Sequence, residues 1–141
     1  MTILHEAYTA LLSGVTHKTG NEIHWQDENG NPITIESIDI KQCKYIVRNY
    51  YNNGQKYLEE EYKNRQQHGK TTRWYENGQK IEETEYKNGQ LHGKKITWYI
   101  NGQKCREADY QNGRKHGKSM GWYNNGKKIW EKEYRDGELI K

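Results

Sequence analysis

The sequence of 141 residues contains no phenylalanine, one proline, two cysteines and two methionines. It also has no run of about 18 apolar residues, and so no membrane-spanning helix is expected. Two cysteines, Cys43 and Cys105, provide neither a disulfide framework nor a zinc-ligand spacing. Residues 1–14 hold no lysine or arginine, which argues against a secretory signal peptide and predicts a cytoplasmic protein.

The apolar material is concentrated in large aromatic rings. Twelve tyrosines and five tryptophans occur in a chain that is only 31% hydrophobic, with a mean hydropathy of -1.37. A disordered chain would be poor in aromatic residues, so we expect a folded but thin structure. The net charge is +4, but both signs are intermixed, which gives only a weak reason to expect an anionic partner.

The main feature of the sequence is an internal repeat with a period of 24 residues. An Asn-Gly dipeptide recurs at this period, with its glycines at Gly54, Gly78, Gly102 and Gly126. One tryptophan per unit stands at Trp74, Trp98 and Trp122. One tyrosine per unit stands at Tyr62, Tyr86, Tyr110 and Tyr134. One glutamate recurs at Glu59, Glu83, Glu107 and Glu131, and a His-Gly-Lys triplet begins at His68, His92 and His116. We expect these shared positions to serve folding.

Each unit is predicted to be a β-hairpin. Asn-Gly between alternating polar and apolar residues favours a type I′ turn, because both central residues of that turn need positive φ. With Asn77-Gly78 as a two-residue loop, Trp74 faces Ile81 on one side of the sheet. A second, longer turn over residues 88–93 passes the chain to the next hairpin. Stacked rings of neighbouring units then supply the core.

The predicted fold is all-β, a single elongated, twisted antiparallel sheet of tandem hairpins. Residues 46–141 form the repeat array, and residues 20–45 form a degenerate first repeat. Residues 1–19 are predicted to be an N-terminal cap with a short helix. The apolar face of that helix is formed by Leu4, Tyr8, Leu11 and Leu12.

The repeat unit resembles a known family. Its pattern, Gly-x4-Trp-Tyr-x-Asn-Gly-Gln-Lys-x2-Glu-x2-Tyr-x-Asn-Gly-x2-His-Gly, is similar to the bacterial variant of the MORN repeat found in the YwqK-type antitoxin or immunity family. The resemblance covers residues 46–139 strongly and residues 20–45 weakly. It implies a twisted sheet of hairpins and an immunity partner of a toxin, although MORN arrays are also associated with scaffolding, self-association and phosphoinositide binding. Arg65 departs from the pattern, and we expect an altered turn there.

The recurrent polar residues do not predict an enzyme. Equivalent atoms in successive repeats lie about 10 Å apart, too far for one metal ion to join two of the recurrent histidines. We expect those histidines to shape the His-Gly turn. We expect the recurrent glutamates to form cross-strand pairs, because a catalytic site needs one distinct arrangement of residues and not a copy in every repeat. Cys105 occupies the position of Ile81 and Ile129, and is predicted to be a small buried apolar residue. We therefore expect no catalytic residue, no metal ion and no cofactor.

We expect a partner to bind at positions where the repeats differ, because the residues that all repeats share are needed for folding. One position changes sharply from unit to unit, at Leu58, Glu82, Arg106 and Trp130. Tryptophan is favoured in interface hot spots, and a tyrosine-rich face with arginines resembles a paratope. The residues predicted to bind a partner are Trp130, Arg106, Arg73, Tyr75, Tyr99 and Tyr123. For the tyrosines the alternative is that their rings pack on one another and on lysine side chains.

Three functions compete at this point. The leading hypothesis is a non-enzymatic interaction module, an antitoxin-like or immunity-like protein that binds and masks a toxin or effector. The first alternative is a self-associating scaffold or homodimer, because open sheet edges can pair. The second is weak contact with an anionic lipid surface through a lysine recurring in each unit, with no specific binding of nucleic acid.

Overall fold

The computed structural model describes the backbone of residues 23–26, 32–39 and 44–141, and the side chains of residues 44–141. The strands are β1 (Ile23–Gln26), β2 (Pro32–Asp39), β3 (Lys44–Tyr50), β4 (Lys56–Lys63), β5 (Gln66–Trp74), β6 (Lys80–Lys87), β7 (Gln90–Trp98), β8 (Lys104–Gln111), β9 (Arg114–Trp122), β10 (Lys128–Arg135) and β11 (Glu138–Leu139).

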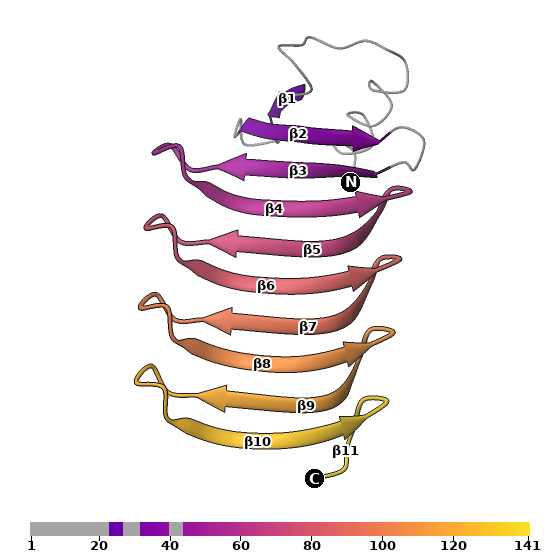
Figure 1. The fold of residues 1–141 in the computed structure, drawn as a ribbon, viewed down its shortest axis with the longest axis vertical. Helices are drawn as coiled ribbons and strands as arrows, with labels where there is room; N and C mark the ends of the chain where they lie inside the picture. Colours follow the sequence, from indigo (N-terminus) through magenta and orange to yellow (C-terminus); the bar gives the residue numbers. More distant parts are fainter. Residues whose placement is uncertain (1–22, 27–31, 40–43) are drawn as a thin grey trace.

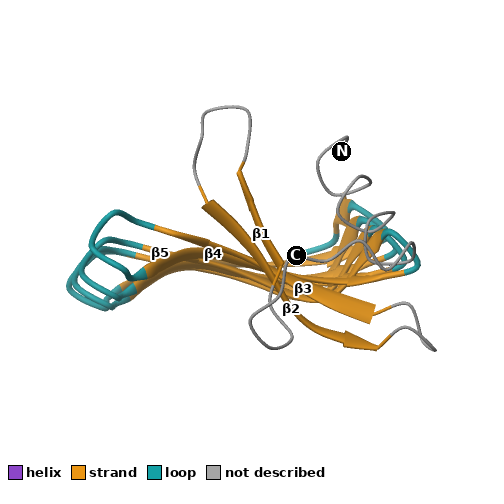
Figure 2. Ribbon diagram, turned by 90° about the horizontal axis from the view of Figure 1, so that it is seen from above, coloured by secondary structure: helices purple, strands orange, loops and turns teal. Residues whose placement is uncertain are grey.

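All these strands form one open antiparallel sheet in which each strand pairs with its neighbours in the sequence, in the order β1 to β11 (Figure 1). Seen along the stack, β3 to β10 superimpose as a single curved layer with turns at both sides (Figure 2). The predicted all-β array of tandem hairpins is therefore confirmed. The described part of the chain contains no helix, and so none that could cross a membrane. The helix predicted within residues 1–19 lies outside the described residues.

The hairpin β1–β2 lies within the predicted degenerate first repeat. Its backbone pairs Trp25 with Ile33 and Gln26 with Pro32. Proline cannot donate a hydrogen bond to a sheet ladder, and its position as the first residue of a strand is one that a sheet tolerates.

The two turns of each repeat are exchanged relative to the prediction: the longer turn lies within the hairpin, and the two-residue turn joins one repeat to the next. Asn77-Gly78 belongs to a three-residue loop, in which Gly78 N donates to Tyr75 O at 3.0 Å and Tyr75 N donates to Gln79 O at 2.8 Å. Only Gly78 has positive φ, at 85°, as in a type I turn followed by a bulged glycine. The Asn77 side chain fixes this loop, because its Oδ1 accepts from Gln79 N at 2.9 Å.

The type I′ turn occurs instead at the junction between repeats. Asn88 and Gly89 have φ values of 51° and 80° and connect Lys87 directly to its partner Gln90. The prediction of a longer second turn over residues 88–93 is therefore wrong. Arg65 also takes positive φ, at 66°, so the turn expected to be altered keeps its form despite the missing glycine.

The His-Gly dipeptide lies within a strand, so its assignment to a turn is also wrong. His92 and Gly93 are part of β7, where the register shifts and Glu85 of β6 faces the extra residues. A Cβ built on Gly93 would approach the Glu85 carboxylate to 2.1 Å. Because that space is filled by a carboxylate, a side chain at this bulge would displace the glutamate.

The sheet has two faces of different composition. One, the tyrosine face, carries the recurrent tyrosines of β4, β6, β8 and β10; the other, the tryptophan face, carries the recurrent tryptophans and glutamates. The predicted pairing of Trp74 with Ile81 is wrong, because Trp74 faces Lys80 and Ile81 is the extra residue of a bulge. The three-residue loop shifts the pairing next to it by one position, and the bulge at Ile81 then restores the register, so that Arg73 faces Glu82 as it would with a two-residue loop.

The buried side chains include small and polar residues as well as one stacked pair of aromatic rings, Tyr45 and Tyr62, whose centroids are 5.1 Å apart. Thr84 is 1% exposed, Ser119 2% and Val47 2%, whereas the recurrent tryptophans are only half-buried. The predicted core of stacked aromatic rings is therefore wrong for the tryptophans. A single-layer sheet has no second layer to bury large rings against, so only the side chains at its middle are enclosed by their neighbours.

Candidate functional site

A continuous row of side chains crosses the tyrosine face, with one residue from each strand from β3 to β10. Cross-strand pairing fixes its order as Asn49, Leu58, Arg73, Glu82, Thr97, Arg106, Gly121 and Trp130. The row contains all four members of the position that differs between the units, and three residues predicted to bind a partner, Arg73, Arg106 and Trp130. We call it the variable row.

The C-terminal part of the variable row borders a hollow of about 440 Å³. Trp130 forms one wall and Arg106 another, and the floor includes Ala108 and Ser119, which are both buried. The Trp130 ring lies directly over Gly121, where a Cβ would meet its Cε2 and Nε1 atoms at 2.6 Å. A glycine is therefore required here for space, and it permits a tryptophan to lie flat on the sheet.

Gly121, Ala108 and Ser119 are not among the residues that the sequence analysis predicts to form the site. Gly121 lies within β9, outside the repeated Asn-Gly and His-Gly dipeptides. The signal was nevertheless present, because Gly121 takes the place of Arg73 and Thr97 in the earlier units. Small residues in three neighbouring register positions combine into one hollow only once the strands are paired.

The remaining predicted binding residues, Tyr75, Tyr99 and Tyr123, lie at the three-residue loops. Tyr75 and Tyr99 donate from their hydroxyls to the backbone of the next repeat, to Trp98 O at 3.3 Å and to Trp122 O at 2.7 Å. Tyr123 is 51% exposed, and its hydroxyl has no such acceptor among the described residues. Tyr75 and Tyr99 therefore hold neighbouring repeats together, and they are not gathered around the hollow.

The tryptophan face is a ladder of ion pairs. In one repeat, the Glu83 carboxylate lies 2.5 Å from the Lys80 ammonium and 3.3 Å from that of Lys70. Lys80 also lies 5.7 Å from the ring centroid of Trp98 in the next repeat, within the range of a cation–π interaction. Burial raises the pKa of Glu83, but hydrogen bonds from both lysines outweigh it and hold that pKa below its usual range.

The same arrangement recurs along the array. At Glu59 and Glu107 burial raises the pKa of the carboxyl group, but hydrogen bonds from basic side chains outweigh this effect and lower the pKa. At Glu131 the hydrogen bond from Lys128 is the main cause of the lowered pKa. Each of these carboxylates is shared by two basic side chains. Most lysines of this face are therefore neutralised within the protein.

Two of the recurrent histidines accept a backbone hydrogen bond from the next turn. Asn88 N donates to His68 Nδ1, and Asp136 N donates to His116 Nδ1, both at 3.3 Å. Within the described residues no group of three His, Cys, Asp or Glu side chains could hold a metal ion. Cys105, which was predicted to be a small buried apolar residue, is half-buried and lines the hollow.

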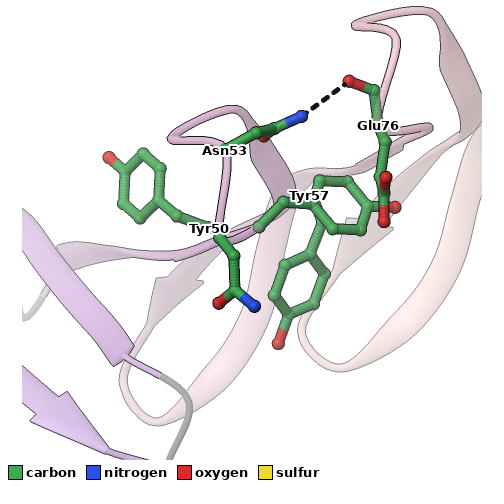
Figure 3. Close-up of a pocket in the computed structure, with 6 residues that line it drawn as sticks. Tyr50, Asn53, Tyr57 and Glu76 are labelled. Atoms are coloured by element: carbon green, nitrogen blue, oxygen red, sulfur yellow. Dashed lines mark hydrogen bonds between the residues drawn. The ribbon is translucent and has the colours of Figure 1, made fainter.

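A second hollow, of about 480 Å³, lies where β3 turns into β4 (Figure 3). Its lining includes Tyr50 and Tyr57, which replace the tryptophan and the isoleucine of later units. Asn53 donates to Glu76 O of the next loop at 3.2 Å, as the dashed line shows (Figure 3). Tyr57 accepts a hydrogen bond from Asn49 of the variable row at 2.7 Å, so its hydroxyl is engaged within the protein.

Comparison with known proteins identifies the repeats. Residues 46–64 and 67–88 match the family model of the MORN repeat variant. Two consecutive repeats of the chain are therefore similar to the MORN repeat variant. No curated protein matches it. Among solved structures, a TarM mutant of S. aureus in complex with Fondaparinux, alpha-GlcNAc-glycerol and UDP is similar over 94% of this chain and 24% of its own, with 14% identity and a TM-score of 0.43. A TM-score this low does not establish a shared fold.

Proposed function

We propose that this protein is a MORN-repeat protein and a non-enzymatic interaction module that binds a partner protein through the variable row. The observation that carries the proposal is Trp130, a half-buried ring held flat over Gly121 beside an exposed arginine. A rigid aromatic anchor next to arginine is typical of the residues that dominate binding energy. Since Trp130 replaces smaller or charged residues of the earlier units, folding of the repeat does not require it.

The partner is proposed to be a toxin or effector that binding masks, as the resemblance to immunity proteins implies. The recurrent glutamates support a non-enzymatic role, because each is engaged by basic side chains and none is set apart from its copies. The lysine-rich tryptophan face supports a lipid-binding role less than the sequence suggested, because its carboxylates neutralise most of its charge.

The test is co-expression with the product of the neighbouring gene, scored by rescue of growth and by formation of a purified complex. We expect Trp130→Ala to abolish rescue while the thermal unfolding midpoint changes little. Ile100→Ala is the matched control, because Ile100 is a large apolar residue in a loop and is 63% exposed. Equal rescue by both variants would show that the variable row is not the binding surface.

Self-association stays a prediction that light scattering can test. A monomer at micromolar concentration would exclude a tight homodimer, whereas a dimer that Trp130→Ala disrupts would place a second copy on the variable row.

A further inference from the structure

The hollow beside Trp130 has an excess of unpaired positive charge. We infer that it receives a carboxylate side chain from an acidic segment of the partner, an inference that rests on the proposed function. The lining residues Lys95, Arg106 and Lys115 are basic, and the facing carboxylate is Glu82. The carboxylate of Glu107, which also lines the hollow, is held by Lys94 and Lys104.

Arg106 has no acidic cross-strand partner. Its cross-strand partners are Thr97 and Gly121, whereas Arg73 in the same row lies opposite Glu82 in the backbone register. Within residues 44–141 the guanidinium of Arg106 takes part in no ion pair or hydrogen bond. An arginine free to offer two parallel N–H donors is suited to bidentate binding of a carboxylate.

Lys115 provides a second positive charge at the same place. Its ammonium lies 4.8 Å from the ring centroid of Tyr134 and pairs with no described carboxylate. Lys95, by contrast, shares the Glu82 carboxylate at 3.7 Å. Two unpaired cations therefore border one hollow, unlike the tryptophan face, where each recurrent carboxylate has two basic partners.

The open geometry favours a protein segment over a free anion. The described residues place no second layer over the tyrosine face, so a small anion would contact one wall and remain hydrated (Figure 2). A protein segment would itself cover the hollow and lay the methylene groups of its acidic residue against Trp130. The variable row crosses eight strands, a length of about 34 Å at about 4.8 Å per strand, which gives an extended segment room to continue.

The test uses the full chain labelled with ¹⁵N, and it follows the indole N–H signal of Trp130, assigned with Trp130→Phe. The probe is a short peptide that carries two glutamates beside a leucine. The same peptide with glutamines and inorganic phosphate serve as comparisons. We expect the acidic peptide to shift the Trp130 signal with a Kd of about millimolar, and the glutamine peptide and phosphate to leave it unchanged.

Arg106→Gln should weaken this binding about tenfold, as expected for the loss of a charged hydrogen-bonding partner. Lys118→Gln is the control, because it removes the same charge from β9 on the tryptophan face, where Lys118 pairs with Glu131. The two variants have the same net charge, so a general electrostatic effect would weaken binding equally in both. Protection of the Cys105 thiol from a disulfide reagent, in a Cys43→Ser background, gives a second readout.

Three results would overturn the inference: no shift with the acidic peptide, an equal shift with phosphate, or an equal loss in both variants. The inference and the proposed function can also fail separately. A partner whose binding depends on Trp130 but not on Arg106 would refute the acidic segment and leave the interaction surface intact. A partner indifferent to both residues would refute the proposed function as well.

Discussion

Arg65 is the residue whose replacement tests most directly how the turns between repeats are stabilised. It holds φ at 66°, at a position where Gly89, Gly113 and Gly137 have φ between 80° and 90°. A left-handed conformation costs an L-residue about 1–2 kcal/mol. Glycine avoids that cost but loses about 0.5–1 kcal/mol in additional chain entropy on folding. The backbone effect of Arg65→Gly is therefore expected to raise the free energy of unfolding by up to about 1.5 kcal/mol.

The matched control separates conformation from contact. The Arg65 side chain has interactions of its own, and both Arg65→Gly and Arg65→Ala remove them, but only glycine removes the backbone strain. Gly113→Ala is the reverse change, and no atom lies within 4 Å of the added Cβ. Its expected loss of about 1 kcal/mol is therefore conformational.

The assay is urea unfolding followed by tryptophan fluorescence, with the slope of the transition compared between variants to exclude changes in cooperativity. For a chain of this length, 1 kcal/mol corresponds to a shift in the thermal midpoint of about 2–4 °C. The reasoning would be refuted if Arg65→Gly and Arg65→Ala had the same stability, or if Gly113→Ala cost nothing.

Three further predictions concern the faces and the repeat contacts. Folding lowers the pKa of Glu107, so the stability that its carboxylate contributes is complete above the unfolded pKa and is lost as the pH falls through the folded one. Glu107→Gln should therefore lose less stability than the unmodified protein between about pH 5 and pH 3, as urea midpoints can show. Tyr99→Phe should cost about 1 kcal/mol through the lost hydrogen bond to the next repeat, whereas Tyr123→Phe should be neutral, as calorimetry can show. Gly121→Ala should displace the ring of Trp130 and shift its indole signal; an unchanged signal would contradict the contact at 2.6 Å.

The hairpin array was predictable because its signals are local and repeated. Alternating residues and turn dipeptides at a 24-residue period define pairs of strands without any distant contact. The type of each turn was not predictable from the dipeptide, since Asn77-Gly78 and Asn88-Gly89 have the same sequence and opposite outcomes. The former becomes a three-residue loop, fixed by an Asn side chain, and the latter a type I′ turn.

That exchange of turns determines which residues face each other. The three-residue loop inserts Ile81 as a bulge and moves Trp74 opposite Lys80, away from the predicted partner. A shift of one residue changes which side of the sheet a side chain occupies. The register of the variable row itself was predictable, because the bulge at Ile81 restores the pairing of Arg73 with Glu82 that a two-residue loop at Asn77-Gly78 would give. The small residues beside Arg106 and Trp130 were not predictable, because their arrangement depends on the pairing of β8 with β9 between repeats.

The amino-acid sequence alone determined the period, the hairpins and the single sheet, because turn residues and alternating side chains act over a few positions. Only the tertiary structure decided the turn types and the hollow beside Trp130. Ala108, Ser119 and Gly121 are small residues whose significance comes from strand pairing. Strand pairing brings together residues that are distant along the chain, and the hollow forms because these three small side chains do not fill the space between them.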